Sequence, residues 1–438
     1  MHPMELTITP TKAAIDTPRE IRVSGLQPFE TIEISTETLR AGIPWRSHAR
    51  FKADAKGIVD LTQQAPLPDK NQDYQTIDPM GLIWSQTPDQ IAQENARDTP
   101  IFSQDLFEPI ATKVRVTGVQ GTIEATFWQQ LADQGIRRIE VREKGLVGVI
   151  YQPKTEGPHP AIMILNGSGG GMNEPRAALY ASRGYIAFAL AYFKAPGLSD
   201  YISNTNLEYF KSGLDWLRQR YNPLDNFVAL NGQSRGGELV LLLASLFPDD
   251  VSAVIAYVPG AVIHSGQNAA DPKIGREAPT WYYQGKALPH LWENNRTASW
   301  APFDEGPNPH RHEWAILTAL DDPEAVERAM IPVEKIRSPI LLISGTDDGA
   351  WPSSRYCQMI IERLAQYDFP YAVHWCDTPN AGHSILFPYL PTTQITHTHP
   401  VSGRINSNGG CPQANAKANE ASWQAVQTFL TDLLKESL

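Results

Sequence analysis

The sequence predicts a two-part protein, an antiparallel β-sandwich followed by an α/β domain with a mostly parallel sheet. Between Glu5 and about Thr126, short stretches such as EIRVSGL and TIEISTET alternate apolar and polar residues with period two, and Pro, Gly and Asp separate them. After about Arg137, continuous apolar runs such as AIMILNG and YIAFALAYF alternate with segments of helical length. We therefore expect a β-sandwich domain over residues 1–137 and an α/β domain over residues 138–438.

Composition and charge limit the classes of function. The chain has 438 residues, with 37 Lys and Arg against 48 Asp and Glu, and a formal net charge of −11. This acidic balance disfavours a nucleic-acid partner, because clustered basic side chains must meet the phosphate backbone. The longest apolar runs, such as LVLLLASLF, are shorter than the roughly 18–20 residues that cross a bilayer, and no apolar stretch follows a basic start. Three scattered cysteines suit a reducing compartment. We expect a cytoplasmic protein without a membrane span.

An insertion interrupts the α/β alternation between Gly266 and Asp321. Its sequence is aromatic and rich in proline, as in PTWYYQGKALPHLWENN. We expect residues 266–321 to lie over the carboxyl edge of the sheet. Such insertions often act as lids, and a packed excursion without a role fits equally well.

The clearest chemical motif is Asn231-Gly232-Gln233-Ser234-Arg235-Gly236-Gly237. It follows the apolar strand NFVAL and opens the apolar helix ELVLLLASLF. In this context G-x-S-x-G forms a sharp strand-to-helix turn, the nucleophile elbow, where Gly232 and Gly236 leave room for closely approaching backbone. The turn exposes the Ser234 hydroxyl, and the helix amino end favours negative charge there. We predict that Ser234 is a nucleophile; the alternative is a glycine-rich turn without chemistry.

A serine hydroxyl is a weak nucleophile, so it needs a base and a group that orients the base. The strand PILLIS runs into GTDDG, where we expect Asp348 to be the acid because of its G-x-x-D spacing, and Asp347 to face solvent or cap the turn. The strand YAVHWCD leads to TPNAGH, which places His383 on a loop at the same sheet edge. The sequence therefore predicts a triad of Ser234, Asp348 and His383. Other histidines lie inside a strand (His374) or in polar loops (His310, His312, His397 and His399).

A glycine run, Gly167 to Gly171, follows the strand AIMILN. A nucleotide-binding role fails on spacing, because G-x-G-x-x-G would need glycine where Met172 stands, and no GK[ST] follows. The run is better explained as an oxyanion hole, in which the backbone N–H of Ser168 or Gly169 acts together with that of Arg235.

Neither a metal nor a cofactor is expected. A site made by His397, His399 and Cys411 is conceivable, but its spacing matches no strong metal-binding pattern.

With these motifs the sequence resembles the acyl-CoA thioesterase and bile acid-CoA:amino acid N-acyltransferase family over nearly its whole length. The matching stretches in the first part include VSGLQPFETIEI and YQTIDPMGLIWSQTP, and in the second NGSGGGMNEPRAALYASRGYIAFALAYF, GQSRGGELVLLLAS and IPVEKIRSPILLISGTDDGAWPS. The resemblance implies an all-β, immunoglobulin-like sandwich followed by an α/β-hydrolase catalytic domain. It also implies that Ser234, Asp348 and His383 form the triad and that the substrate is a small-molecule acyl thioester, such as acyl-CoA, or an ester.

The residue at the elbow separates two reactions of this family. Members that conjugate amino acids have cysteine there, whereas this chain has Ser234. An acyl-cysteine is a thioester that amines attack readily, while an acyl-serine is an oxyester better suited to water. We therefore expect a thioester hydrolase. The alternatives are an N-acyltransferase, a carboxylic ester hydrolase and a non-catalytic binding protein; the sequence does not fix the oligomeric state.

Overall fold

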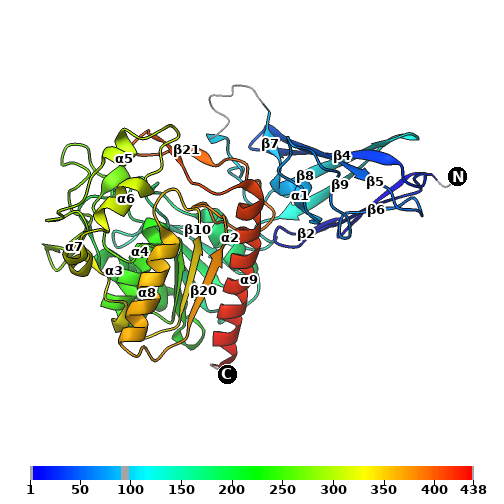
Figure 1. Cartoon of the computed structure of the whole chain (residues 1–438). Helices are drawn as coiled ribbons and strands as arrows, with labels where there is room; N and C mark the ends of the chain where they lie inside the picture. The colour runs from blue at the N-terminus through cyan, green and yellow to red at the C-terminus, as the bar shows by residue number, and fades with distance from the viewer. Residues whose placement is uncertain (1–2, 90–97, 437–438) are drawn as a thin grey trace. The chain divides into compact units, whose positions relative to one another are not determined.

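The structure is a computed structural model that describes residues 3–89 and 98–436 (Figure 1). Its contacts divide the chain into two compact units. The first unit comprises Met1–Asp133, Leu386–Ile395 and Cys411–Glu420, and the second comprises Gln134–Ile385, Thr396–Gly410 and Ala421–Leu438.

The first unit is a β-sandwich whose two sheets share an apolar core. One sheet has the strand order β1-β3-β6 and the other β2-β9-β8-β4-β5-β7. Period two is visible in β4, where Ile32 and Ile34 are buried while Glu33 is exposed, and the inward side chains join Val23 and Phe127 in the core. The elements are β1 (Glu5–Thr9), β2 (Lys12–Ala14), β3 (Glu20–Ser24), β4 (Thr31–Arg40), β5 (Ile43–Lys52), β6 (Val59–Asp60), α1 (Gly81–Trp84), β7 (Thr87–Pro88), β8 (Ile110–Gly118) and β9 (Gly121–Gln130).

The sandwich departs from the predicted antiparallel pattern at one edge. The three-residue strand β2 pairs with β9 in the parallel direction, whereas β4, β5, β8 and β9 pair antiparallel. An alternating sequence indicates which face a residue occupies, and it carries no information about the direction of a short edge strand.

The second unit is an α/β domain built on a mostly parallel sheet. Within the described residues the sheet has eight strands in the order β10-β11-β13-β12-β15-β16-β19-β20. Only β10–β11 and β11–β13 pair antiparallel. The strands are β10 (Arg137–Val141), β11 (Val147–Gln152), β12 (Ala161–Leu165), β13 (Ile186–Ala191), β15 (Val228–Gln233), β16 (Ala253–Tyr257), β19 (Ile340–Gly345) and β20 (Val373–Thr378).

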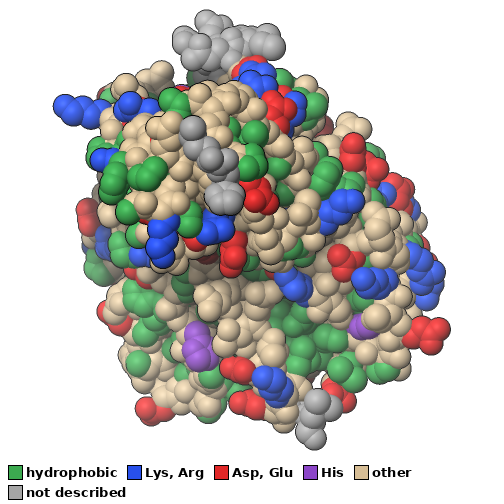
Figure 2. Space-filling model, turned by 90° about the vertical axis from the view of Figure 1, so that its right-hand side faces the viewer, with side chains coloured by type: hydrophobic (Ala, Val, Ile, Leu, Met, Phe, Trp, Pro, Cys, Tyr) green, Lys and Arg blue, Asp and Glu red, His purple; other side chains and the backbone are tan. Residues whose placement is uncertain are grey.

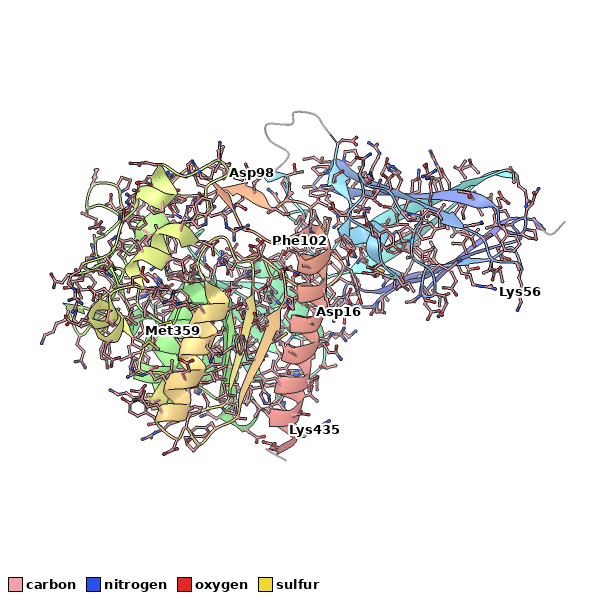
Figure 3. All side chains as sticks on the ribbon, viewed as in Figure 1. Asp16, Lys56, Asp98, Phe102, Met359 and Lys435 are labelled. Carbon is pink, nitrogen blue, oxygen red and sulfur yellow. The ribbon has the colours of Figure 1, made fainter. Side chains whose placement is uncertain are left out.

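Helices cover both faces of this sheet, which explains its continuous apolar strands. Figure 1 shows α4 and α8 on one face and α2 with the later part of α9 on the other, and Figure 3 places Met359 on α8. The helices are α2 (Glu174–Ser182), α3 (Glu208–Tyr221), α4 (Arg235–Leu246), α8 (Ser353–Gln366) and α9 (Pro412–Glu436). The apolar stretch YAVHWCD, like AIMILNG and YIAFALAYF, is expected from the sequence to be a buried strand, and this expectation is wrong: β20 is the sheet's edge strand, and Trp375 is 37% exposed.

Smaller elements lie in the segments that connect the strands and helices of this domain. Several of them lie in the predicted insertion, whose hairpin β17–β18 extends from β14 in a small separate sheet. The elements are β14 (Thr205–Asn206), η2 (Leu224–Asn226), η3 (Pro248–Asp250), η4 (Gln267–Ala269), β17 (Trp281–Tyr283), β18 (Lys286–Ala287), α5 (Ala301–Asp304), α6 (Glu313–Ala319), α7 (Pro323–Ala329), η5 (Val333–Lys335), β21 (Thr396–Thr398) and β22 (Ile405–Ser407).

The order of the strands locates the binding edge. The chain runs outward from β12 to β13 and then returns to β15 on the other side of β12, so the direction of winding changes between β12 and β15. Ligands of open α/β sheets bind at the carboxyl ends of strands at such a switch point. The glycine run follows β12 and the Ser234 turn follows β15, so both lie at this position.

The charged side chains on the surface and the apolar length of the helices bear on the expected partners. Acidic and basic side chains are interspersed over the face in Figure 2. In the part of the chain that the structure describes, no helix is long and apolar enough to span a membrane.

Three expectations from the sequence stay predictions. They are the domain assignments 1–137 and 138–438, the lid role of residues 266–321 and the cytoplasmic location.

Candidate active site

The turn between β15 and α4 holds Ser234 in an unusual backbone conformation. Ser234 has φ 59° and ψ −117°, and its N–H donates to the carbonyl of Tyr257 over 2.9 Å. Positive φ is costly for a residue with a side chain, so the surrounding structure must fix it. Close backbone packing does so: a Cβ on Gly232 would lie 1.8 Å from the carbonyl oxygen of Gly236, and one on Gly236 would lie 2.3 Å from that of Leu165. Both glycines are therefore required by the approach of neighbouring backbone.

His383 lies within hydrogen-bonding distance of the Ser234 hydroxyl. The distance from His383 Nε2 to Ser234 Oγ is 2.7 Å, and Nδ1 lies 2.8 Å from Asp348 Oδ2. The backbone N–H of His383 donates to the carbonyl of Asn408 over 2.8 Å, which anchors the loop after β20. The structure thus joins the three predicted residues in one hydrogen-bonded chain, with the ring nitrogens aligned for proton transfer from the serine.

The two adjacent aspartates have different surroundings. The Asp348 side chain is 1% exposed, and its Oδ1 accepts the backbone N–H groups of Ala350 (2.9 Å) and Trp351 (3.2 Å) while Oδ2 faces His383. The Asp347 side chain is 48% exposed and forms an ion pair with Arg311 at 2.9 Å. Asp348 is therefore the carboxylate that can orient the His383 ring.

The predicted oxyanion donors lie beside the same turn. Gly167 packs against the elbow, since a Cβ there would lie 3.0 Å from the Gln233 carbonyl oxygen. Within the described residues, the backbone N–H groups of Ser168, Gly169 and Arg235 donate to no protein acceptor. Arg235 also begins α4, whose amino end favours negative charge. These groups remain available to an anionic oxygen.

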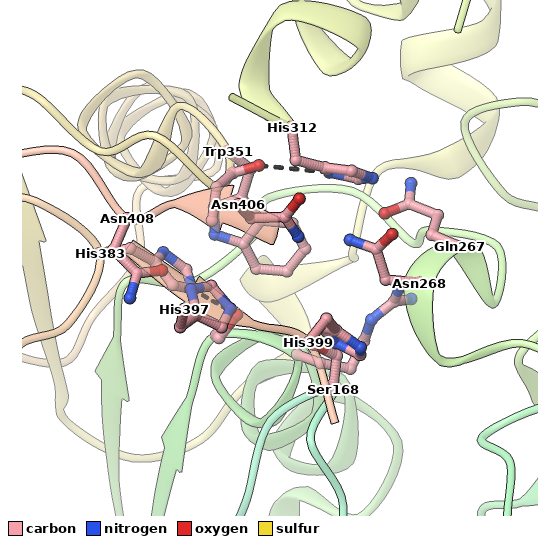
Figure 4. A pocket seen from close by; sticks show the side chains of 13 residues that line it. Ser168, Gln267, Asn268, His312, Trp351, His383, His397, His399, Asn406 and Asn408 are labelled. Atoms are coloured by element: carbon pink, nitrogen blue, oxygen red, sulfur yellow. Dashed lines mark hydrogen bonds between the residues drawn. The ribbon is translucent and has the colours of Figure 1, made fainter. Parts of the chain in front are cut away.

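A small polar pocket of about 70 Å³ opens at Ser234 (Figure 4). Its walls come from the glycine run, from η4 and His312 of the insertion, and from the hairpin β21–β22. Arg404, at the start of that hairpin's second strand, forms an ion pair with Asp304 of the insertion at 2.6 Å, and Asp304 is also bound by Arg276. The hydrogen bond from Arg276, with that from Arg404, lowers the pKa of Asp304 to about 2, so the pair stays charged at neutral pH.

Two histidines in this pocket are neutral. Burial lowers the pKa of His399 and that of His312 to about 3 in each case. His399 Nδ1 accepts the N–H groups of Val401 and Ser402, so its Nε2 carries the proton and donates to Ser168 Oγ over 2.8 Å. His312 Nδ1 donates to the carbonyl of Ala350 over 3.3 Å, which leaves Nε2 as an acceptor.

The Arg235 side chain is held beneath the elbow. Its guanidinium donates to the backbone carbonyls of His264 (3.1 Å) and Ser265 (2.7 Å), and it lies 3.8 Å from Glu238. Glu238 in turn accepts from Trp281 Nε1 over 2.6 Å. This buried network fixes the first turn of α4, and it commits Arg235 to structural partners.

The sequence predicts the triad residues at this edge, but it does not place His312, His399 or Asn406 there. Both histidines lie in polar, Pro-containing loops, which give no sign of a site. They reach the pocket only through the folding of the segments 266–321 and 396–410 over the sheet. Among the described residues, no group of three or more His, Cys, Asp or Glu side chains is arranged to hold a metal ion.

Comparison with known proteins gives matches along both units. Residues 16–143 match the model described as acyl-CoA thioester hydrolase/BAAT N-terminal region, and residues 205–436 match that described as BAAT/acyl-CoA thioester hydrolase C terminal. Acyl-coenzyme A thioesterase 6 of Mus musculus is 29% identical, over 98% of this chain and 96% of that protein. Acyl-coenzyme A thioesterase 5 of Mus musculus is 30% identical, over 94% of this chain and 93% of that protein. Among solved structures, a dienelactone hydrolase-like phosphotriesterase from metagenomic libraries is 16% identical, with a TM-score of 0.39 over 68% of this chain and 98% of that chain.

The elbow geometry predicts that Gly232→Ala destabilises the protein. The added methyl meets backbone atoms that cannot turn away, so we expect the free energy of unfolding to fall by about 1–3 kcal/mol or more. Gly169→Ala is the matched control, because a Cβ there meets Pro400 at an ordinary 3.5 Å. Chemical denaturation of both variants measures the difference; equal midpoints would contradict the close packing at the elbow.

Proposed function

Because the chain belongs to the BAAT/acyl-CoA thioester hydrolase family, we propose that it cleaves acyl-CoA to free acid and CoA through a triad of Ser234, His383 and Asp348. The observation that carries the proposal is the hydrogen-bonded chain from Ser234 Oγ through the His383 ring to Asp348 Oδ2. It supplies a nucleophile, a base and an orienting carboxylate at the switch point of the sheet.

The first half-reaction forms an acyl-serine. Ser234 Oγ attacks the thioester carbonyl while His383 Nε2 takes the hydroxyl proton, and Asp348 stabilises the imidazolium that results. The carbonyl oxygen becomes negative and accepts the N–H groups of Arg235 and of Ser168 or Gly169. The intermediate collapses by breaking the carbon–sulfur bond, and the sulfur of CoA receives the proton from His383.

The second half-reaction releases the acid. Water attacks the acyl-serine carbonyl, His383 takes a proton from that water, and the bond to Ser234 Oγ breaks as the hydroxyl regains its proton. The acyl-serine is an oxyester, which is less open to amine attack than the thioester that a cysteine nucleophile would form. This difference supports water as the acceptor.

We predict different effects for the two neighbouring aspartates. Asp348→Asn should lower kcat by a factor on the order of 10⁴, because it disturbs the tautomer and orientation of His383. Asp347→Asn removes the charge from a partly exposed ion pair with Arg311, and the amide oxygen can still accept the N–H of Gly410, so we expect less than about a fivefold loss. Steady-state kinetics with one acyl-CoA tests both variants, and reversed effects would assign the acid to Asp347.

The product distinguishes hydrolysis from transfer. We expect acyl-CoA turnover to give free acid, with millimolar glycine or taurine diverting almost none of it into amide. Arg235, the basic residue after the nucleophile, is engaged by backbone carbonyls and is a poor clamp for the carboxylate of an amino acid. Mass spectrometry of the products is the measurement. Substantial N-acyl amino acid would favour a transferase, and Ser234→Cys should raise any small amide fraction.

A further inference from the structure

The pocket at Ser234 is small, and most of the residues that line it are polar. Among the described residues that line it, only Ala350 and Trp351 have apolar side chains. Its volume of about 70 Å³ is well below the roughly 300–1,000 Å³ of pockets that enclose drug-sized ligands. One buried water needs about 10–15 Å³ of cavity volume, so the pocket has room for about five groups of the size of a water molecule. A long alkyl chain does not fit this space.

The pocket contains buried polar atoms that have no protein partner. Gln267 Nε2, His312 Nε2 and Asn406 Oδ1 each make no hydrogen bond within the described residues. The exposed fractions of these residues are 6%, 6% and 4%. A buried polar atom without a partner costs about 1–3 kcal/mol. Figure 4 shows the side chains of Gln267, His312 and Asn406 pointing toward a common space, together with Asn268.

The enclosed side of the site faces the acyl group. CoA is far larger than the pocket and carries several phosphates, so it must extend from Ser234 toward solvent. The group bonded to the thioester carbonyl is then the part that occupies the enclosed space. The unpartnered atoms therefore lie where the first few atoms of the acyl chain are held.

Their chemistry matches an uncharged hydroxyl. A hydroxyl donates one hydrogen bond and accepts up to two. It can accept from Gln267 Nε2 and donate to His312 Nε2 or Asn406 Oδ1. A carboxylate would only accept, so it would leave both acceptors unpaired, and the Arg235 guanidinium is already engaged by two backbone carbonyls.

We propose that this pocket selects short acyl groups that carry an uncharged hydroxyl within a few bonds of the scissile carbonyl, with Gln267, His312 and Asn406 as its hydrogen-bonding partners. The proposal rests on the proposed thioester hydrolysis and adds the substrate class.

The test compares substrates that differ by one hydroxyl. We expect kcat/KM for 3-hydroxybutanoyl-CoA or 2-hydroxybutanoyl-CoA to exceed that for butanoyl-CoA by at least about tenfold, since each unmade buried hydrogen bond costs on the order of a factor of ten. Palmitoyl-CoA and the carboxylate-bearing succinyl-CoA should both be poorer than the hydroxylated substrate. The same acyl pair is also measured as p-nitrophenyl esters, which removes any dependence on CoA.

Variants that replace the polar groups by apolar ones of similar size test the assignment. Gln267→Met, His312→Phe and Asn406→Leu should each reduce the ratio of hydroxylated to plain substrate toward one. Because the ratio is measured in one protein preparation, partial misfolding does not mimic this effect. Gln358→Met is the control for Gln267→Met; Gln358 is exposed on α8, where its amide donates to Glu362 over 2.9 Å, and it does not line the pocket, so the ratio should stay as in the wild type.

The outcomes separate the two proposals. Equal rates for butanoyl-CoA and its hydroxylated forms, or a preference for palmitoyl-CoA or succinyl-CoA, would overturn the hydroxyl proposal while leaving thioester hydrolysis intact. If no acyl-CoA reacts but the ester pair shows the preference, the thioester function fails and the pocket assignment stands. An unchanged ratio in all three variants would also refute the assignment.

Discussion

The turn at Ser234 is the constraint on which the site depends. A residue with a side chain is held there at φ 59°, and the turn requires glycine on both sides of it. A Cβ on Gly232 would collide with the backbone of Gly236, and one on Gly236 would collide with the end of β12. This conformation lifts the hydroxyl out of the line of β15 and leaves the N–H of Arg235 free at the start of α4. The strained backbone of this one turn thus positions both the nucleophile and one oxyanion donor. The buried network of Arg235 and Glu238 fixes the first turn of α4, which follows them.

The remainder of the site is assembled by segments that follow parallel strands. Asp348 comes after β19 and His383 after β20, and the alignment of parallel strands brings their loops to the same edge as the elbow. The hairpin β21–β22 and the insertion then enclose this edge, and the Arg404–Asp304 ion pair links them. Burial keeps His312 and His399 neutral, so the surroundings of the triad are polar without adding net charge. That environment is suited to hydrogen bonding with a small substrate group.

The sequence predicts those features that depend on residues close together in the chain, and it does not predict those that depend on long-range packing. The family and the fold class follow from hydrophobic pattern and motif, and both are confirmed. Ser234, Asp348 and His383 each follow a strand, so the topology of the sheet is enough to bring them together. The distances between their side chains support the assignment as a triad. Their catalytic roles stay a prediction. Gln267, His312 and Asn406 could not be found this way, because their loops carry no period and their positions depend on long-range packing. The parallel pairing of β2 and the edge position of β20 were missed for a similar reason: pattern does not encode strand direction or neighbours.

The most direct test of the account is whether Ser234 is the reactive serine of the folded protein. A fluorophosphonate probe reports this without any assumption about the substrate, because the activated serine oxygen attacks phosphorus and fluoride leaves. Peptide mass spectrometry of the treated wild-type protein should find one phosphonylated peptide, with the adduct on Ser234. The adduct should be absent in Ser234→Ala and strongly reduced in His383→Ala, which keeps the serine and loses the base. An adduct on another serine, or equal labelling of Ser234 with and without His383, would contradict the proposed site.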